Sequence, residues 1–262
     1  MGNPPEMQLR VGWASDVGRV REHNEDACLA DPTHGLFIVS DGMGGQQAGA
    51  LASQIVVQVL PEMIKLRLPR APRVPAEQIR RSLRESIGEI SRGVCSQSTG
   101  TPGLQGMGAT VVLALVRGHT AHLAHMGDSR AYILRDGHLQ QLTEDHSVVG
   151  LLLRLKQITA REAAVHPARG QLSRHLGMEG NPLPEARSVR LKNSDRLLLC
   201  SDGLTGMLTD KEIGRILKLA PEPDVACRAL VDAANQAGGR DNVTVVIVVF
   251  GQANSGSTVR AL

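Results

Sequence analysis

Short apolar runs that end in an aspartate recur along the chain. The clearest is residues 36–40, Leu-Phe-Ile-Val-Ser, which lead into Asp41 and then into the glycine-rich segment 42–45. An apolar run of this length predicts a buried strand. Glycines directly after a strand indicate a turn in which the backbone approaches another group closely. Two further runs show the same arrangement, residues 123–127 before Asp128 and residues 197–201 before Asp202.

Apolar residues at helical spacing appear in two pairs of segments. The first pair covers residues 48 to about 66 and 76–95, and the second covers 209 to about 219 and 224–237. Residues 147–166 are also helical in pattern. Two capping boxes support these predictions, Thr159 with Glu162 and Thr209 with Glu212.

The remaining regular segments predict eight to ten strands. Residues 135–138, Arg-Asp-Gly-His, carry the Asp-Gly signal of a hairpin turn. The predicted strands are residues 8–14, 27–30, 36–40, 109–116, 120–126, 131–134, 188–191, 196–201 and 243–250.

Two antiparallel β-sheets packed face to face, with a helix pair on each outer side, would bury all of these apolar faces. The predicted fold is therefore α+β, a four-layer α/β/β/α sandwich. No internal repeat or linker divides the chain, so we expect a single domain over residues 8–250. Residues 1–7 are predicted to form a loose arm, 96–107 a loop and 251–262 a flexible tail.

Composition narrows the class of protein. A chain of 262 residues suits one large domain, and with only 2% aromatic residues its core must be aliphatic. The formal net charge of +3 is too small to imply a nucleic-acid partner. No apolar run is long enough to span a membrane and no signal peptide is present, so a cytoplasmic location is expected. The four cysteines lack zinc-site spacing and are expected to be free thiols.

A set of aspartates beside glycine or asparagine at strand ends points to a chemistry. Clustered carboxylates repel one another unless cations compensate. Two divalent cations about 3.5–4 Å apart turn a bridging water into a hydroxide nucleophile near neutral pH, and an arginine can clamp a phosphate. This combination indicates phosphate-ester hydrolysis without a protein nucleophile. The side chains are Arg21, Asp26, Asp41, Asp128, Asp202 and Asp241.

The same residues carry a family resemblance. The chain resembles the metal-dependent Ser/Thr protein phosphatases of the type 2C (PPM) family in their bacterial single-domain form. No single motif is specific, but seven in the family's order are. They are residues 20–26 (Val-Arg-Glu-His-Asn-Glu-Asp), 41–45 (Asp-Gly-Met-Gly-Gly), 108–110 (Gly-Ala-Thr), 127–130 (Gly-Asp-Ser-Arg), 144–147 (Glu-Asp-His-Ser), 201–204 (Ser-Asp-Gly-Leu) and 240–244 (Arg-Asp-Asn-Val-Thr).

The resemblance implies roles for individual residues. Arg21 would hold the substrate phosphate. Asp41 would bridge two Mn²⁺ or Mg²⁺ ions, and the backbone carbonyl of Gly42 would complete one site. Asp26 would ligate through water with the support of Glu25.

The second ion would be held by Asp202 and Asp241, with Asn242 behind them. Asp128, together with Asp202, would take a third and weaker metal ion. Residues 147–180 would correspond to a flap beside the active site that shapes substrate choice.

The chain departs from the family's pattern at a few positions. Gln46 and Ala50 stand where bacterial relatives commonly have His and Glu, and we expect changed packing with retained activity. Residues 169–177 differ from the relatives' Thr-Arg-Ala-Leu-Gly flap sequence, so substrate preference stays open. His175 replaces a small residue there, and a solvent-facing role is favoured over that of a proton donor near the leaving group.

Other catalytic or metal-binding arrangements do not fit. His119, His122 and His125 are three residues apart, so on a strand the side chain of His122 would point to the face opposite to the other two. A zinc site formed by all three is therefore not expected. The chain has no cysteine with an arginine six residues later, no Asp-x-Asp and no Gly-Lys-Ser/Thr. These absences argue against cysteine-nucleophile, aspartyl-phosphate and nucleotide P-loop chemistry.

The sequence therefore predicts an enzyme, a hydrolase that removes phosphate from phosphoserine and phosphothreonine in proteins and so reverses Ser/Thr kinase signalling. A metal-bridged hydroxide would attack phosphorus, and a metal-bound water would protonate the leaving oxygen. Expected partners are phosphoproteins and a cognate Ser/Thr kinase, with no nucleic acid and no membrane, and the protein is expected to be a monomer. The alternative is a non-catalytic phosphoprotein-binding regulatory scaffold on the same fold.

Overall fold

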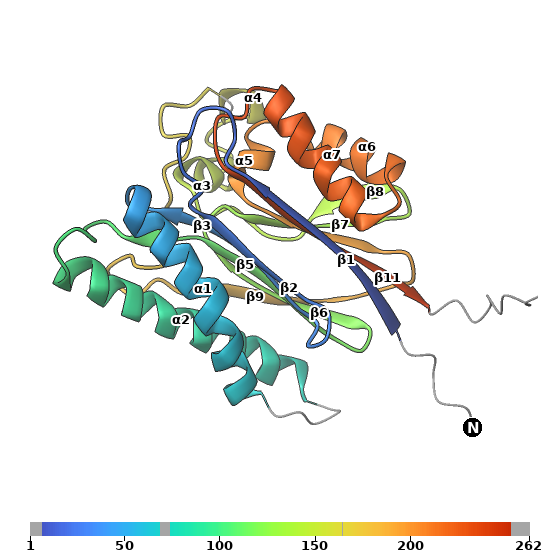
Figure 1. The fold of residues 1–262 in the computed structure, drawn as a ribbon, viewed down its shortest axis with the longest axis horizontal. Coiled ribbons are helices and arrows are strands. Elements are labelled where there is room, and N and C mark those ends of the chain that lie inside the picture. The colour runs from blue at the N-terminus through green and yellow to red at the C-terminus, as the bar shows by residue number, and fades with distance from the viewer. Residues whose placement is uncertain (1–6, 69–73, 164, 253–262) are drawn as a thin grey trace, which may run out of the picture.

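Two antiparallel sheets form the centre of the computed structural model, which describes residues 7–68, 74–163 and 165–252 (Figure 1). The first sheet has the order β1 (Met7–Asp16), β11 (Val243–Gln252), β10 (Arg196–Cys200), β7 (Arg130–Arg135) and β8 (His138–Gln141). The second has the order β2 (Asp26–Asp31), β3 (Leu36–Met43), β5 (Val111–Arg117), β6 (Thr120–Met126) and β9 (Glu185–Arg190), and β4 (Gly108–Ala109) pairs with the end of β3.

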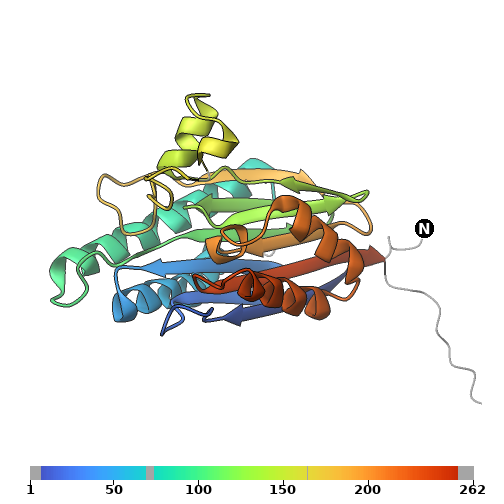
Figure 2. The ribbon, with the colours of Figure 1, turned by 90° about the horizontal axis from the view of Figure 1, so that it is seen from above.

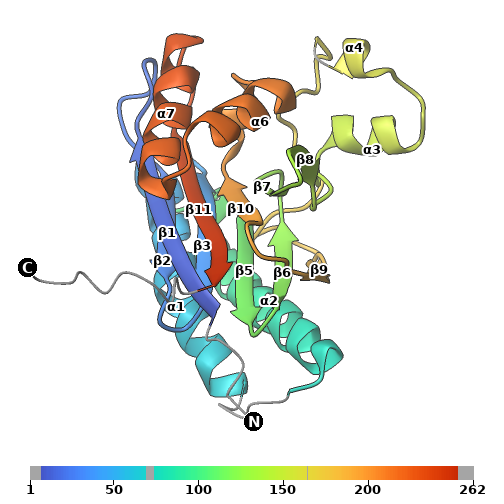
Figure 3. The same ribbon diagram turned by 90° about the vertical axis from the view of Figure 1, so that its right-hand side faces the viewer.

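Helices cover the outer face of each sheet (Figures 1 and 3). On the second sheet lie α1 (Gln46–Arg67) and α2 (Ala76–Gly100). On the first lie α6 (Asp210–Leu219) and α7 (Pro223–Gln236), with the short α5 (Asp202–Thr205) at the end of β10. The predicted α+β fold with two antiparallel sheets is confirmed, and the helix pairs occupy the two outer layers.

The alternation of side chains along β3 shows how the layers are built. Phe37 and Val39 belong to the apolar cluster between the two sheets, whereas Leu36 and Ile38 belong to the cluster under α1 and α2. A strand exposes successive side chains to opposite faces. Since β3 is covered on both faces, its sequence is continuously apolar rather than alternating.

Most predicted elements are present, with changes at their ends. Helix α2 continues to Gly100, so the predicted loop 96–107 begins five residues later. The hydroxyl of Thr99 donates to the Cys95 carbonyl at 3.0 Å and stabilises this last turn. Strand β3 also runs further than predicted and includes Asp41, Gly42 and Met43.

The segment predicted as one helix over 147–166 forms two short helices, α3 (Val148–Arg154) and α4 (Ala160–Ala163). Lys156 between them has a φ of 56°, which no α-helix accommodates. Ser147 caps α3 by accepting from Gly150 N at 3.0 Å. Figures 2 and 3 show α3 and α4 standing away from the sheets.

The predicted arm and tail fall mostly outside the described residues. Met7 opens β1, and residues 251 and 252 belong to β11 rather than to the tail. Residues 1–6 and 253–262 lie outside the described part of the chain. All four cysteines are free thiols. Among the helices of the described residues, none combines the length and the apolar character that crossing a membrane requires.

Candidate metal centre

The strand ends that carry aspartates meet at one edge of the sandwich. Asp26 opens β2 and pairs in register with Asp41 of β3. Asp202 is the first residue of α5 and lies two residues after the end of β10, and Asp241 lies two residues before β11. Asp128 lies in the turn between β6 and β7. Chain segments from both sheets therefore supply carboxylates to the same place.

A cavity of about 380 Å³ opens at this edge. Of the residues predicted for the site, only Asp26 is absent from the lining, because it is buried behind it with 7% of its surface exposed. The lining residues are Arg21, Glu25, Asp41, Gly42, Met43, Gly44, Gly45, Thr110, Asp128, Gly170, Leu172, His175, Asp202, Asp241 and Asn242.

Two glycines let the start of α1 lie against the strand that carries Asp41. A Cβ atom added to Gly42 would come 2.0 Å from the Gly49 carbonyl oxygen. One added to Gly49 would come 1.8 Å from Glu25 Oε2. The Gly42 N–H donates to the Glu25 carbonyl at 3.2 Å. Gly42 and Gly49 therefore let three backbone segments approach one another beside the carboxylates.

Burial and mutual repulsion raise the pKa values of these carboxyl groups. Burial raises the pKa of Asp26 to about 7, and burial with the charge of Asp202 raises the pKa of Asp128 to about 8. The pKa of Asp41 is raised well above its usual range, first by burial and then by the charges of the other four aspartates. Burial, followed by the charge of Asp241, also raises the pKa of Asp202. The cluster can ionise fully only if cations compensate its charge.

The donor atoms fit hard divalent cations. Asp26 Oδ2 accepts a hydrogen bond from Ser201 Oγ at 2.8 Å. Its Oδ1 is buried and has no hydrogen-bond partner within the described residues. A buried carboxylate oxygen without a donor is costly unless a cation or its water satisfies it. An all-oxygen set of carboxylates and a carbonyl is the set that Mg²⁺ and Mn²⁺ prefer.

Arg21 lies at the mouth of the cavity, where it forms an ion pair. Its Nη2 is 2.8 Å from Asp241 Oδ2. The hydrogen bond to Asp241 and the charge of that carboxylate raise the pKa of Arg21. Both side chains are partly exposed, with 53% and 36% of their surface accessible. A guanidinium at this place can reach a phosphate group at the carboxylate cluster.

Asn242 ties the loop that carries Arg21 to the start of β11. Its Oδ1 accepts from Glu25 N at 2.8 Å, and its Nδ2 donates to the carbonyls of Val17 and His23, both at 2.9 Å. All three bonds go to the backbone of residues 17–25. Asn242 therefore fixes the position of both Arg21 and Glu25 relative to the aspartates.

The predicted flap contributes its returning limb to the cavity. Ser147 and Leu172 form an isolated bridge between the two limbs, and Gly170, Leu172 and His175 line the cavity. A second cavity, of about 520 Å³, adjoins the first and shares Asp128, Gly170, Asp202 and Asp241 with it. Its lining adds Arg130, Asp145, Arg169 and Arg240.

A histidine cluster lies behind the Asp128 turn, and the sequence interpretation missed it. His125, His146 and Glu185 have potential metal ligands within 4.8 Å of one another, and the two imidazoles stack at 4.5 Å. His146 Nδ1 accepts from Gly127 N at 3.2 Å, so its Nε2 carries the proton and faces Glu185 Oε1 at 3.1 Å. Arg174 occupies the same Glu185 oxygen at 3.2 Å.

This arrangement is not an ion site, because a protonated Nε2 cannot bind a metal. The Nε2 atom lies near Glu185 but forms no hydrogen bond of good geometry within the described residues. Burial, followed by the charges of His125 and Arg174, lowers the pKa of His146 to about 4, so its ring is neutral. The Glu-Asp-His-Ser motif at 144–147 marked the segment. The partner of His146, Glu185, is remote in the sequence, so no local pattern indicates their contact.

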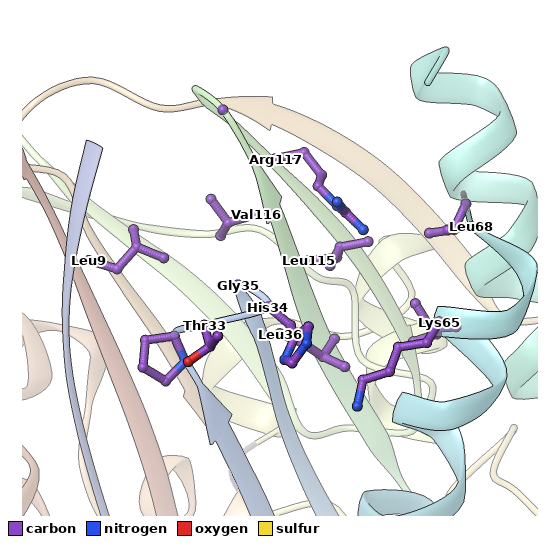
Figure 4. Close-up of a pocket in the computed structure, with 13 residues that line it drawn as sticks. Leu9, Thr33, His34, Gly35, Leu36, Lys65, Leu68, Leu115, Val116 and Arg117 are labelled. Carbon is purple, nitrogen blue, oxygen red and sulfur yellow. The ribbon is translucent and has the colours of Figure 1, made fainter. Parts of the chain in front are cut away.

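A third cavity, of about 610 Å³, lies at the opposite end of β3 (Figure 4). Apolar residues such as Leu9, Leu36 and Leu115 line it, together with His34, Lys65 and Arg117. No carboxylate lines this cavity among the described residues. It therefore lacks the ligands that the first cavity offers to a cation.

The sequence matches one protein family and is similar to proteins of known activity. The family described as protein phosphatase 2C matches residues 18–237. The serine/threonine phosphatase stp of Listeria monocytogenes is 38% identical over 243 residues, which cover 92% of this chain and 95% of that protein.

Solved structures agree with this match. PppA, described as a key regulatory component of T6SS in Pseudomonas aeruginosa, has a TM-score of 0.80 at 34% identity, covering 92% of this chain and 97% of that one. The catalytic domain of the serine/threonine protein phosphatase PstP, in complex with 2 manganese ions, has a TM-score of 0.80 at 34% identity, covering 94% and 100%.

Proposed function

The chain belongs to the protein phosphatase 2C family, and we propose that the cluster of five aspartates described above is its active site. It is a metal-dependent protein serine/threonine phosphatase, and its cofactors are Mn²⁺ or Mg²⁺. The observation that supports this placement is the convergence of carboxylates from both sheets on one cavity that Arg21 also lines. No observation favours the non-catalytic scaffold, since every predicted ligand position is filled.

We propose that Asp41 and the Gly42 carbonyl, with Asp202 and Asp241, hold two divalent ions. Asp26 would support one of these ions, and Asp128 with Asp202 would hold a third. When bound, the ions supply Lewis acidity and activate water for attack on phosphorus. Glu25 and Asn242 position these ligands from behind.

The chain's own groups bind and orient the substrate. The Arg21 guanidinium is a planar donor that matches two phosphoryl oxygens and steadies them while water attacks in line. No cysteine, serine or histidine is needed as a nucleophile, so we expect no phosphoenzyme intermediate. A covalent phosphoenzyme trapped during turnover would contradict this mechanism.

Finer parts of the function are also proposals. The catalytic unit would span residues 8–250, with residues 147–180 as the flap that selects substrates. The protein would act as a cytoplasmic monomer opposite a Ser/Thr kinase that phosphorylates the same proteins. No nucleic acid or membrane would take part.

The direct test is hydrolysis of p-nitrophenyl phosphate and of a phosphothreonine peptide with Mn²⁺, with Mg²⁺ and with excess EDTA. We expect activity that requires metal and returns when metal is restored after EDTA. Asp41→Asn and Asp202→Asn should lower kcat at least about 100-fold, since each removes a charge on which the ions depend. Near-wild-type turnover in either folded variant would contradict the ligand assignment.

A further inference from the structure

His175 lies in the cavity of the aspartate cluster rather than on the outer surface of the flap. It is half-buried and lines the same cavity as Arg21, Asp41 and Asp128. The sequence favoured a solvent-facing histidine at this position. The structure instead places its ring where a bound phosphoprotein would meet the carboxylates.

The ring has one nitrogen committed and one available. Nδ1 lies 2.9 Å from the Leu176 carbonyl oxygen, which can only accept. Nδ1 therefore carries a proton. No hydrogen bond is found for Nε2 within the described residues, so this atom is available to a ligand in the cavity.

The backbone around His175 is fixed relative to the proposed metal ligands. Leu176 exchanges two hydrogen bonds with Ala109, at 2.8 and 3.2 Å. Strand β4, which contains Ala109, pairs Ala109 with Gly42. The ring itself packs on Gly108, where an added Cβ would come 2.9 Å from His175 Nδ1. The flap histidine is therefore positioned from the strand pair that also carries Asp41.

Arg21 and the aspartates proposed as cation ligands, which line the same cavity, cannot donate a proton during turnover. Arginine does not lose its proton in proteins, and carboxylates that bind cations are deprotonated. The neighbouring Arg174 turns away to Glu185 at 3.2 Å. The ionisable groups facing His175 across the cavity are Arg21, Glu25, Asp41, Asp128, Asp202 and Asp241.

We propose that His175 is a catalytic residue that protonates the leaving oxygen of the phosphoserine or phosphothreonine substrate. This proposal rests on the function proposed above. Water forms the new bond to phosphorus, the bond between phosphorus and the substrate oxygen breaks, and its electron pair goes to that oxygen. The oxygen takes the proton from Nε2 of the imidazolium. The proton that water loses restores the imidazolium through solvent.

The test compares substrates that differ in their need for this proton. The leaving groups of phenyl phosphate and of a phosphothreonine peptide are basic oxyanions that need a proton. The p-nitrophenolate released from p-nitrophenyl phosphate leaves without protonation. In His175→Gln and His175→Ala, kcat/KM for the first two should fall about 100-fold and that for p-nitrophenyl phosphate by less than about threefold. The exposed His138→Ala serves as a control and should match the wild type on all three substrates.

Equal losses on all substrates in the His175 variants would overturn the proposal. No loss on any substrate would also overturn it, and would assign protonation of the leaving oxygen to a water at the ions. If wild-type protein with Mn²⁺ hydrolyses none of the substrates, the proposed function itself fails.

Discussion

Removal of metal should make the stability of this protein fall as the pH rises from about 5 to 8. The cause is the buried carboxylate cluster, above all Asp26, whose pKa is raised from 3.8 to about 7 mainly by burial. Between these two values the folded protein holds a proton that the unfolded chain has already released. Raising the pH therefore favours the unfolded state.

The size of the effect follows from the pKa difference. Each unit of pKa corresponds to about 1.4 kcal/mol, so Asp26 alone contributes a loss of about 4 kcal/mol between low and high pH, of which about 3 kcal/mol falls between pH 5 and 8. Asp26 is 7% exposed, so solvent screens little of this. The pKa of Asp128, raised to about 8, extends the loss to higher pH. Bound cations compensate the charge and should abolish the dependence.

The assay is urea unfolding at pH 5, 6, 7 and 8, in EDTA and in Mn²⁺, with circular dichroism as the signal that monitors unfolding. We expect the free energy of unfolding in EDTA to fall steadily with pH and the gap between the two conditions to widen. Asp26→Asn keeps the shape of the side chain without its charge, so its EDTA series should be flatter. A wild-type EDTA series that stays level or rises would refute the reasoning.

Two further substitutions test how the site is held. Gly49→Ala should lower Mn²⁺ affinity at least about tenfold by calorimetry, because its Cβ would meet the Glu25 carboxylate. Gly93→Ala, whose Cβ meets nothing within 4 Å, should leave affinity unchanged. His146→Ala should raise the Mn²⁺ concentration needed for half-maximal activity, because the Gly127 N–H loses its acceptor, at a cost of about 1–3 kcal/mol. His146→Asn, which can restore an acceptor, should recover most of the loss, and identical behaviour of the two variants would contradict this role.

The layers and the strand ends were predictable because they depend on local patterns. The run at 36–40 is apolar throughout because β3 is covered on both faces. The pairing of Asp26 with Asp41 follows from a hairpin whose strands flank a four-residue turn, 32–35. The capping box at Thr209 is present as predicted.

What the local patterns could not supply is long-range geometry. No periodicity places Asp128 or Asp241 beside Asp41, and only the motif order suggested that they meet. The split of the predicted helix 147–166 depends on the backbone of Lys156, whose positive φ is unusual for that residue type. The turn of His175 into the cavity depends on the backbone pairing of its neighbour with β4, which is remote in sequence.

The ion pair between Arg21 and Asp241 links two binding events. The guanidinium proposed to receive the phosphate is paired with a carboxylate proposed to receive a metal ion. An ion bound at Asp241 would release Arg21 for the substrate, and a phosphate bound at Arg21 would release Asp241 for the ion. By thermodynamic reciprocity, each ligand then raises the affinity for the other by the same factor. The phosphatase would thus act as a coincidence detector, which binds phosphoproteins tightly only when its metal ions are bound.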